Sequence, residues 1–144
     1  MRTLALVLSL FSLLACDPLV MIPGGRLSGD TKPVPASWAF TDAVETVQLE
    51  TRPGDPYSVN IWGVAAGDDF YVASGKSDNT WAQAIAADDR VRLRVDGSIY
   101  ELRAVRDDTT EGRDRFLAAA QAKYDFEPEP DQAADAVLFR LVAR

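Results

Sequence analysis

Hydrophobic and polar residues alternate along much of the chain after residue 43, which is the pattern of β-strands with one buried face. The first such stretches are Val44–Arg52, Tyr57–Ala65 and Phe70–Ala73. The sequence Pro53-Gly54-Asp55-Pro56 separates the first two, and Gly67-Asp68-Asp69 precedes the third, and both are typical of turns. These three stretches therefore predict a meander of antiparallel strands.

The spacing of apolar residues then changes from that of a strand to that of a helix. Trp81, Ala84 and Ile85 recur at helical spacing, and Asp78 stands before them as a candidate helix cap. The sequence therefore predicts a short helix that ends near Asp88.

A hairpin, a second helix and a final strand follow. Val91–Val95 and Ile99–Val105 alternate again, and the Asp96-Gly97 pair between them is typical of a tight hairpin turn. Thr109 and Thr110 open the second helix, and Ala136–Val142 predicts the last strand. The apolar stripe of the second helix consists of Phe116, Leu117, Ala120 and Tyr124, and the prolines that close it are Pro128 and Pro130.

The first residues have a different character. An apolar run covers residues 4–14 behind the basic Arg2, and it is too short for a membrane-spanning helix but typical of a secretory signal peptide. It ends in Leu13-Leu14-Ala15-Cys16, which resembles the lipobox of bacterial lipoproteins at all four positions. The resemblance implies cleavage after Ala15 and attachment of a diacylglycerol to the Cys16 thiol. The alternatives to a lipoprotein are a plain signal peptide and a buried amino-terminal helix with a chance cysteine.

Three segments are expected on this basis: a signal peptide over 1–15, a lipidated amino terminus and flexible tether over 16–37, and a globular domain over 38–144. The tether is rich in proline and glycine, which disfavour regular structure. We expect the lipid on Cys16 to hold the protein on the membrane, facing the periplasm or the cell exterior. Asp17 stands where enteric-type sorting reads a signal for inner-membrane retention.

Composition narrows the possible chemistry. The chain has 144 residues, with 22 Asp and Glu against 15 Lys and Arg, and a formal net charge of −7. Such an acidic protein is repelled by phosphate backbones, which argues against nucleic-acid binding. There is no histidine and Cys16 is the only cysteine, so zinc sites and His-based catalytic triads are excluded. No Asp/Glu cluster has the spacing of a calcium loop, and no other metal site is indicated.

Part of the chain resembles a known family of flavin-binding proteins. The sequences concerned are YSVNIWGV at 57–64, DFYVASG at 69–75 and WAQAIAADDRVRLRVDGSIYEL at 81–102. They resemble deazaflavin-dependent nitroreductases and related pyridoxamine-phosphate-oxidase-like proteins over roughly Val44–Val105. The resemblance implies a mainly β fold with two or three helices, built as a six-stranded antiparallel split β-barrel of the FMN-binding type.

The resemblance also implies a cofactor site in the loop before the first helix. In such families this loop contacts the cofactor phosphate, and the matching residues are Ser74, Gly75, Lys76 and Ser77. Glycine allows close backbone approach, Lys76 supplies charge, and the hydroxyls supply donors. The cofactor would be FMN or a deazaflavin, although an ordinary solvated loop has the same composition. Such proteins commonly form homodimers, which predicts a dimer held by strands such as Tyr57–Ala65.

Other conspicuous residues have structural explanations that we prefer. Trp62 and Trp81 could line a flavin, but aromatic residues on a strand and on a short helix are more often core. The row Arg90, Arg92 and Arg94 could bind an anion, but alternation on a half-buried strand produces such a row.

Two classes of function stay open at this point. The first is a membrane-tethered domain that binds a ligand or partner, and the second is a flavin- or deazaflavin-dependent oxidoreductase. The sequence offers no catalytic side chain, but in such enzymes the cofactor performs the hydride chemistry. Arg2 is the only basic residue before the apolar run, so export of a folded protein with its cofactor is not indicated. Whether the protein is an enzyme is therefore not decided by the sequence.

Overall fold

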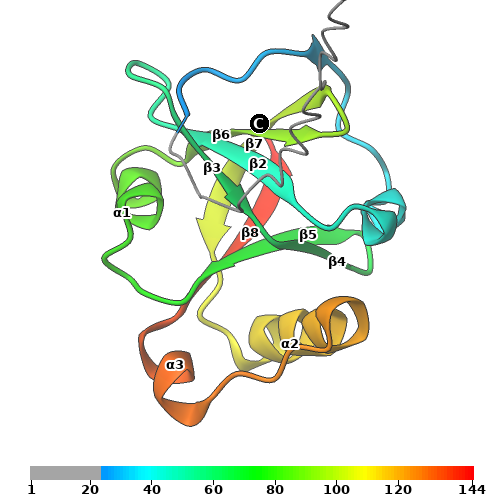
Figure 1. The fold of residues 1–144 in the computed structure, drawn as a ribbon, viewed down its shortest axis with the longest axis vertical. Helices are drawn as coiled ribbons and strands as arrows, with labels where there is room; N and C mark the ends of the chain where they lie inside the picture. Colours follow the sequence, from blue (N-terminus) through cyan, green and yellow to red (C-terminus); the bar gives the residue numbers. More distant parts are fainter. Residues whose placement is uncertain (1–23) are drawn as a thin grey trace, which may run out of the picture.

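A computed structural model describes residues 24–144, which form a curled β-sheet with three α-helices (Figure 1). The predicted signal peptide, Cys16 and Asp17 lie outside the described residues. Among the residues that are described, no helix is both long enough and apolar enough to cross a bilayer.

The sheet contains eight strands. They are β1 (Asp30–Thr31), β2 (Val47–Thr51), β3 (Tyr57–Ile61), β4 (Gly63–Ala66), β5 (Asp69–Ser74), β6 (Arg90–Val95), β7 (Ser98–Arg106) and β8 (Val137–Ala143). The helices are α1 (Thr80–Ala87), α2 (Thr110–Tyr124) and α3 (Pro130–Asp135), and a 3-10 helix, η1, covers Ala39–Ala43.

The sheet curls because its two edges are consecutive in the chain. The strand order is β3-β2-β6-β7-β8-β5-β4, and β1 adds in parallel to β7 while the other pairs are antiparallel. Only Trp62 separates β3 from β4, although these strands stand at opposite ends of the order. The sheet must therefore bend round until its ends meet, which gives a half-barrel.

The inner face of the half-barrel holds the main hydrophobic core. Side chains that alternate along the strands fill it, and α1 adds Trp81, Ala82 and Ile85. A smaller cluster lies on the outer face, where α2 covers β4 and β5 and buries Val64, Tyr71 and Ala120. In Figure 1, α2 and α3 lie together on one side of the curled sheet, away from α1.

The mainly β architecture with helices is confirmed, but the expectation of six strands is wrong. The run Tyr57–Ala65 is two strands, because Ile61 pairs with Val47 of β2 whereas Gly63 pairs with Val72 of β5. The additional strand β1 has two residues, which is too few to show an alternating pattern.

The predicted helix caps have different outcomes. Thr109 caps α2, because its side chain accepts a hydrogen bond of 3.0 Å from the Gly112 amide. At α1 the cap residue is Asn79 rather than Asp78, and no side-chain bond closes the cap. The side-chain amide of Asn79 instead donates to Ser74 Oγ at 2.6 Å and thereby shapes the preceding loop.

Residues 24–31, which belong to the predicted tether, pack along the barrel and are called the N-terminal strap here. Gly24 pairs with Ser58, β1 pairs with β7, and Leu27 is buried. The Leu27 amide donates to Glu50 Oε2 at 2.6 Å. Arg92 donates to the same carboxylate oxygen at 2.9 Å and to the Leu27 carbonyl at 3.1 Å. The domain boundaries expected from the sequence stay a prediction.

Candidate functional site

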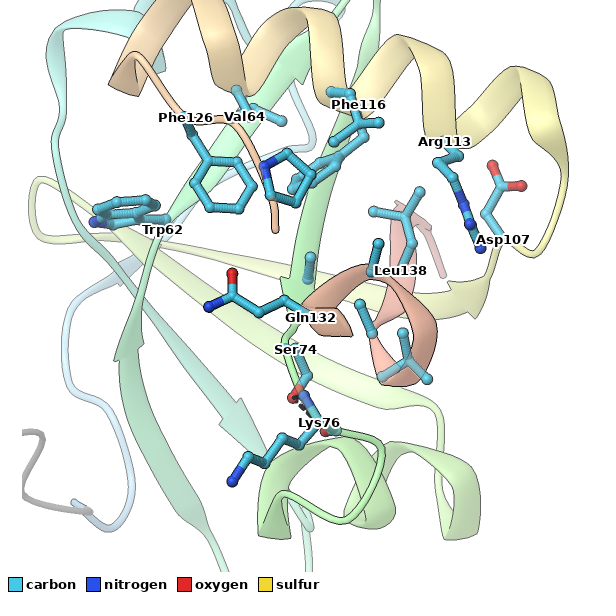
Figure 2. Close-up of a pocket in the computed structure, with 18 of the residues that line it drawn as sticks. Trp62, Val64, Ser74, Lys76, Asp107, Arg113, Phe116, Phe126, Gln132 and Leu138 are labelled. Carbon is cyan, nitrogen blue, oxygen red and sulfur yellow. Dashed lines mark hydrogen bonds between the residues drawn. The ribbon is translucent and has the colours of Figure 1, made fainter. Parts of the chain in front are cut away.

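A cleft of about 440 Å³ lies between the helices α2 and α3 and the outer face of the sheet, and is called the α2 cleft here. Its walls are mostly apolar. The residues from the sheet and the following loops are Trp62, Val64, Ala73, Ser74, Gly75, Lys76, Asp107, Asp108, Val137 and Leu138. The residues from α2, α3 and their connections are Arg113, Phe116, Leu117, Ala120, Tyr124, Phe126, Pro128, Gln132, Ala133 and Ala136. Figure 2 shows the arrangement.

One end of the cleft is an aromatic corner formed by Trp62, Tyr124 and Phe126. The rings of Trp62 and Tyr124 are stacked, with centroids 4.4 Å apart and planes 7° from parallel. Phe126 stands edge-on to Trp62 at 6.1 Å and 82°. In Figure 2, Trp62 and Phe126 lie side by side at this end, and Gln132 points toward them from α3.

The predicted cofactor loop forms another end of the cleft. Ser74, Gly75 and Lys76 line the cleft, whereas Ser77 lines a smaller neighbouring pocket of about 180 Å³. Ser74 is buried, and its hydroxyl donates to the Lys76 carbonyl at 2.6 Å while it accepts from Asn79. Ser77 donates its hydroxyl to Asp135 Oδ1 at 2.7 Å. Both hydroxyls are therefore occupied by the protein, and Gly75 and Lys76 are left facing solvent.

Two cations of the cleft have no acidic partner among the described residues. Eight ion pairs occur in residues 24–144, and neither Lys76 nor Arg113 takes part in them. The two carboxylates nearby are already bonded: Asp107 accepts from Thr109 Oγ1 at 2.6 Å, and Asp108 accepts from Arg106 Nε at 2.8 Å. Asp107 lies beside Arg113 at one end of the cleft, whereas Lys76 lies at the loop end, so an anionic ligand can meet positive charge near Lys76 although the protein is acidic overall (Figure 2).

Hydrogen bonds and burial set the protonation of the groups around α2. The hydrogen bond from the Thr109 side chain lowers the pKa of Asp107, which favours the carboxylate. Burial raises the pKa of Tyr124, so its phenol stays protonated, and it donates to the Glu45 carbonyl at 2.7 Å. Burial lowers the pKa of Lys123, whose ammonium donates to the carbonyls of Thr41 at 2.9 Å and Gly63 at 2.8 Å. These bonds fix the carboxyl end of α2 beside the aromatic corner.

The structure decides between the two interpretations of Trp62, Trp81 and the arginine row. Trp81 is a core residue, as preferred, but the same assignment for Trp62 is wrong, because Trp62 is 50% exposed and lines the α2 cleft. The arginine row is structural: Arg90 pairs with Asp88, Arg92 with Glu50, and Arg94 donates to Gln48. No group of acidic or cysteine side chains suited to a metal ion occurs in residues 24–144.

Sequence reasoning missed Arg113, Phe126 and Gln132 as cleft residues. Helical spacing could have identified Arg113, because it stands three residues before Phe116 on the same face of α2. Phe126 and Gln132 follow the end of α2, and their positions depend on how α3 folds back over the sheet. No local pattern in the sequence carries that information.

The residues of the cleft suit a planar aromatic anion. The aromatic corner offers a stacking surface, and Lys76 and Arg113 offer charge. An added β-carbon at Gly75 would meet nothing within 4 Å, so there is open space at this part of the loop for an anionic group. A flavin or deazaflavin has the required ring and phosphate, but it would depend on Lys76 and on backbone amides rather than on the serine hydroxyls.

Comparison with solved structures finds the same fold in several proteins, which include an FAD-binding protein and an F420 reductase. A conserved hypothetical protein from Mycobacterium tuberculosis is 20% identical with a TM-score of 0.60, and the match covers 74% of this chain and 77% of that one. An FAD-binding protein from Mesorhizobium loti is 19% identical with a TM-score of 0.52, covering 72% and 83%. An F420 reductase is 19% identical with a TM-score of 0.53, covering 76% and 94%.

At these identities the comparisons establish the fold alone. No family model and no curated protein sequence matches the chain. The chain therefore shares a curled antiparallel half-barrel with these proteins, and its sheet has eight strands rather than the six expected from the sequence.

Proposed function

We propose that this protein binds a planar aromatic ligand with an anionic group in the α2 cleft, and that it presents this site outside the cytoplasm from a lipid anchor. The single observation that carries the binding proposal is the cleft itself. It joins an aromatic corner to two cations that lack acidic partners among the described residues. Burying a ring in such a cleft removes apolar surface from water, and a cation of the cleft attracts the charged end of the ligand.

A flavin or deazaflavin is the first ligand to test. The solved structures with this fold include proteins described as FAD-binding and as an F420 reductase. When bound, such a cofactor would supply hydride transfer, and the chain would bind and orient it. In this proposal Lys76 holds the phosphate, while Trp62 and Phe126 contact the ring.

Titration of the full chain in detergent with FMN, FAD and F420, followed by ligand fluorescence, tests this proposal. We expect saturable binding, and we expect Lys76→Glu to weaken FMN binding by about tenfold or more, because one attraction is replaced by a repulsion. Lys32→Glu is the matched control, because it makes the same charge change on an exposed residue outside the cleft. Absence of binding for all three ligands rejects the flavin assignment.

An oxidoreductase is the second candidate, and the fold shared with an F420 reductase favours it. It adds one requirement to ligand binding: the reduced, bound cofactor must be oxidised by a small acceptor faster than the free cofactor is. Absorbance of the reduced cofactor measures this difference. Equal rates with and without protein would leave a binding domain without redox turnover.

The anchor is a separate proposal that rests on Leu13-Leu14-Ala15-Cys16. Cys16→Ser removes the thiol that the lipid needs, so the variant should move from the membrane fraction to the soluble fraction. If it sediments with membranes as the original chain does, the anchor assignment is wrong. Separation of inner and outer membranes tests the further expectation, based on Asp17, that the protein is retained in the inner membrane.

A further inference from the structure

Trp62 differs from the other tryptophans of the protein in its exposure. Trp38 is 2% exposed and Trp81 is 5% exposed, and both belong to the main core, whereas Trp62 is 50% exposed. A single exposed apolar side chain needs no special explanation. Trp62, however, is one of the residues that line the α2 cleft, and it lies beside Phe126 at the aromatic end (Figure 2).

The backbone beside Trp62 is held in place. Ile61 and Gly63 on either side are buried, so the Trp62 side chain points to the opposite, outer face of the sheet. A β-carbon on Gly63 would lie 2.4 Å from Cζ of the fully buried Phe70, so the chain packs closely here. The direction of the Trp62 side chain is therefore fixed by the core beneath it.

The ring plane of Trp62 is also fixed. Tyr124 covers one face of the indole in a nearly parallel stack. The Tyr124 hydroxyl is itself bonded to the carbonyls of Glu45 at 2.7 Å and Gly63 at 3.1 Å, which prevents the phenol ring from turning away. Phe126 meets Trp62 edge-on, and Trp62 keeps half of its surface exposed, so Tyr124 and Phe126 together cover only part of the indole.

We propose that the face of Trp62 opposite Tyr124 is a stacking subsite for the aromatic ring of the cleft ligand, with Phe126 as its side wall. The inference rests on the proposed binding function and adds where the ring lies, with the anionic group placed toward Lys76. The surface is preorganised, because Tyr124 and Gly63 already hold the indole in its plane, so little conformational freedom is lost on binding. An aromatic pair of this kind contributes about three- to tenfold in affinity.

Riboflavin and FMN separate the contribution of the ring from that of the phosphate, because riboflavin lacks the phosphate. In the full chain in detergent, Trp62→Leu should weaken both ligands by about the same factor, three- to tenfold. Lys76→Glu should weaken FMN but leave riboflavin unchanged. Trp62→Phe keeps an aromatic face and should recover part of the affinity. Phe40→Leu is the control, because Phe40 is 46% exposed and does not line the cleft.

A second measurement tests the contact directly. Among the described tryptophans Trp62 alone is substantially exposed, so acrylamide should quench its emission selectively, and a ring stacked on it should protect it. Unchanged affinity of Trp62→Leu for both flavins, or no protection from acrylamide at saturating ligand, overturns the subsite.

If the proposed flavin binding fails, the stacking subsite can still be tested with another ligand. If neither flavin binds, 1-anilinonaphthalene-8-sulfonate, an aromatic anion, tests the subsite on its own. Weaker binding of this probe to Trp62→Leu than to Phe40→Leu supports the subsite without a flavin, and equal binding to the two variants rejects it. A urea unfolding curve for each variant shows whether a loss of binding comes from a loss of folding.

Discussion

At Gly63 the neighbouring side chains leave no room for a β-carbon. A β-carbon there would lie 2.4 Å from Cζ and 2.7 Å from Cε1 of Phe70, a ring that is fully buried and cannot move aside. We expect Gly63→Ala to lower the free energy of unfolding by about 1–3 kcal/mol through overpacking, measured by urea denaturation. Gly75→Ala is the control and should be near neutral, because nothing lies within 4 Å of its added β-carbon.

Lys123 gives a prediction that depends on pH. Its ammonium donates to two backbone carbonyls, so Lys123→Met should cost about 1–2 kcal/mol near neutral pH. Burial lowers its pKa in the folded state below the unfolded value of 10.5, so between the two values the unfolded chain binds more protons. The stability that Lys123 confers therefore rises with pH through this window.

Urea denaturation of the original chain and of Lys123→Met, at about pH 7 and about pH 10, measures this difference. The gap in the free energy of unfolding between the two proteins should be larger at the higher pH. A gap that shrinks with rising pH contradicts a lowered pKa for this lysine.

Trp62 shows what the sequence could and could not reveal about single residues. The alternation of Val59, Ile61 and Gly63 on one face already places Trp62 on the other, and the structure agrees. Aromatic residues on strands are so often buried that the sequence nevertheless favours a core position for Trp62. Its exposure depends on α2 and α3, which cover its surroundings only in part, and no local pattern encodes that.

Among the elements, α3 has the weakest attachment to the rest of the protein. It contains no buried residue, and the side-chain bond between Ser77 and Asp135 ties its end to the loop before α1. We expect Asp135→Ala to increase amide hydrogen exchange in residues 130–135 while the overall stability changes by less than about 1 kcal/mol. Glu129→Ala is the control, because Glu129 precedes α3 without a side-chain cap bond. Equal exchange in both variants would mean that Ser77 does not hold α3.

The hydrogen bond between Ser77 and Asp135 also removes one hydroxyl of the predicted cofactor loop from ligand binding. The family resemblance assigns Ser74, Gly75, Lys76 and Ser77 to a phosphate site. A sequence cannot show that Ser74 and Ser77 are already bonded to Asn79 and Asp135. The helical stripe of α2 was predicted correctly, including Phe116 and Tyr124. The spacing of apolar residues in α2 does not show that this stripe borders a cleft, because the cleft forms only when segments far apart in the chain come together.

For the molecule as a whole, the closing of the half-barrel and the position of the strap depend on contacts between distant residues. Arg92 in β6 is the clearest case, because it bonds both Glu50 in β2 and the carbonyl of Leu27 in the strap. The Glu50 side chain is 2% exposed and that of Arg92 is 17% exposed, so this ion pair lies largely away from water. A surface pair such as Arg103 with Asp89 has side chains 51% and 43% exposed and is screened by solvent.

Arg92→Met should therefore destabilise the protein by about 3 kcal/mol or more, because it leaves the buried Glu50 carboxylate without its cation. Arg103→Met should cost less than about 1 kcal/mol, since its ion pair is exposed. Urea denaturation measures both values, and hydrogen exchange at the Leu27 amide, which donates to Glu50, reports release of the strap. In the double variant Arg92→Met with Glu50→Gln the buried charge is absent, so part of the stability should return. If Arg92→Met costs no more than Arg103→Met, or if the double variant is as unstable as the sum of the two single changes, the strap is not held by this ion pair.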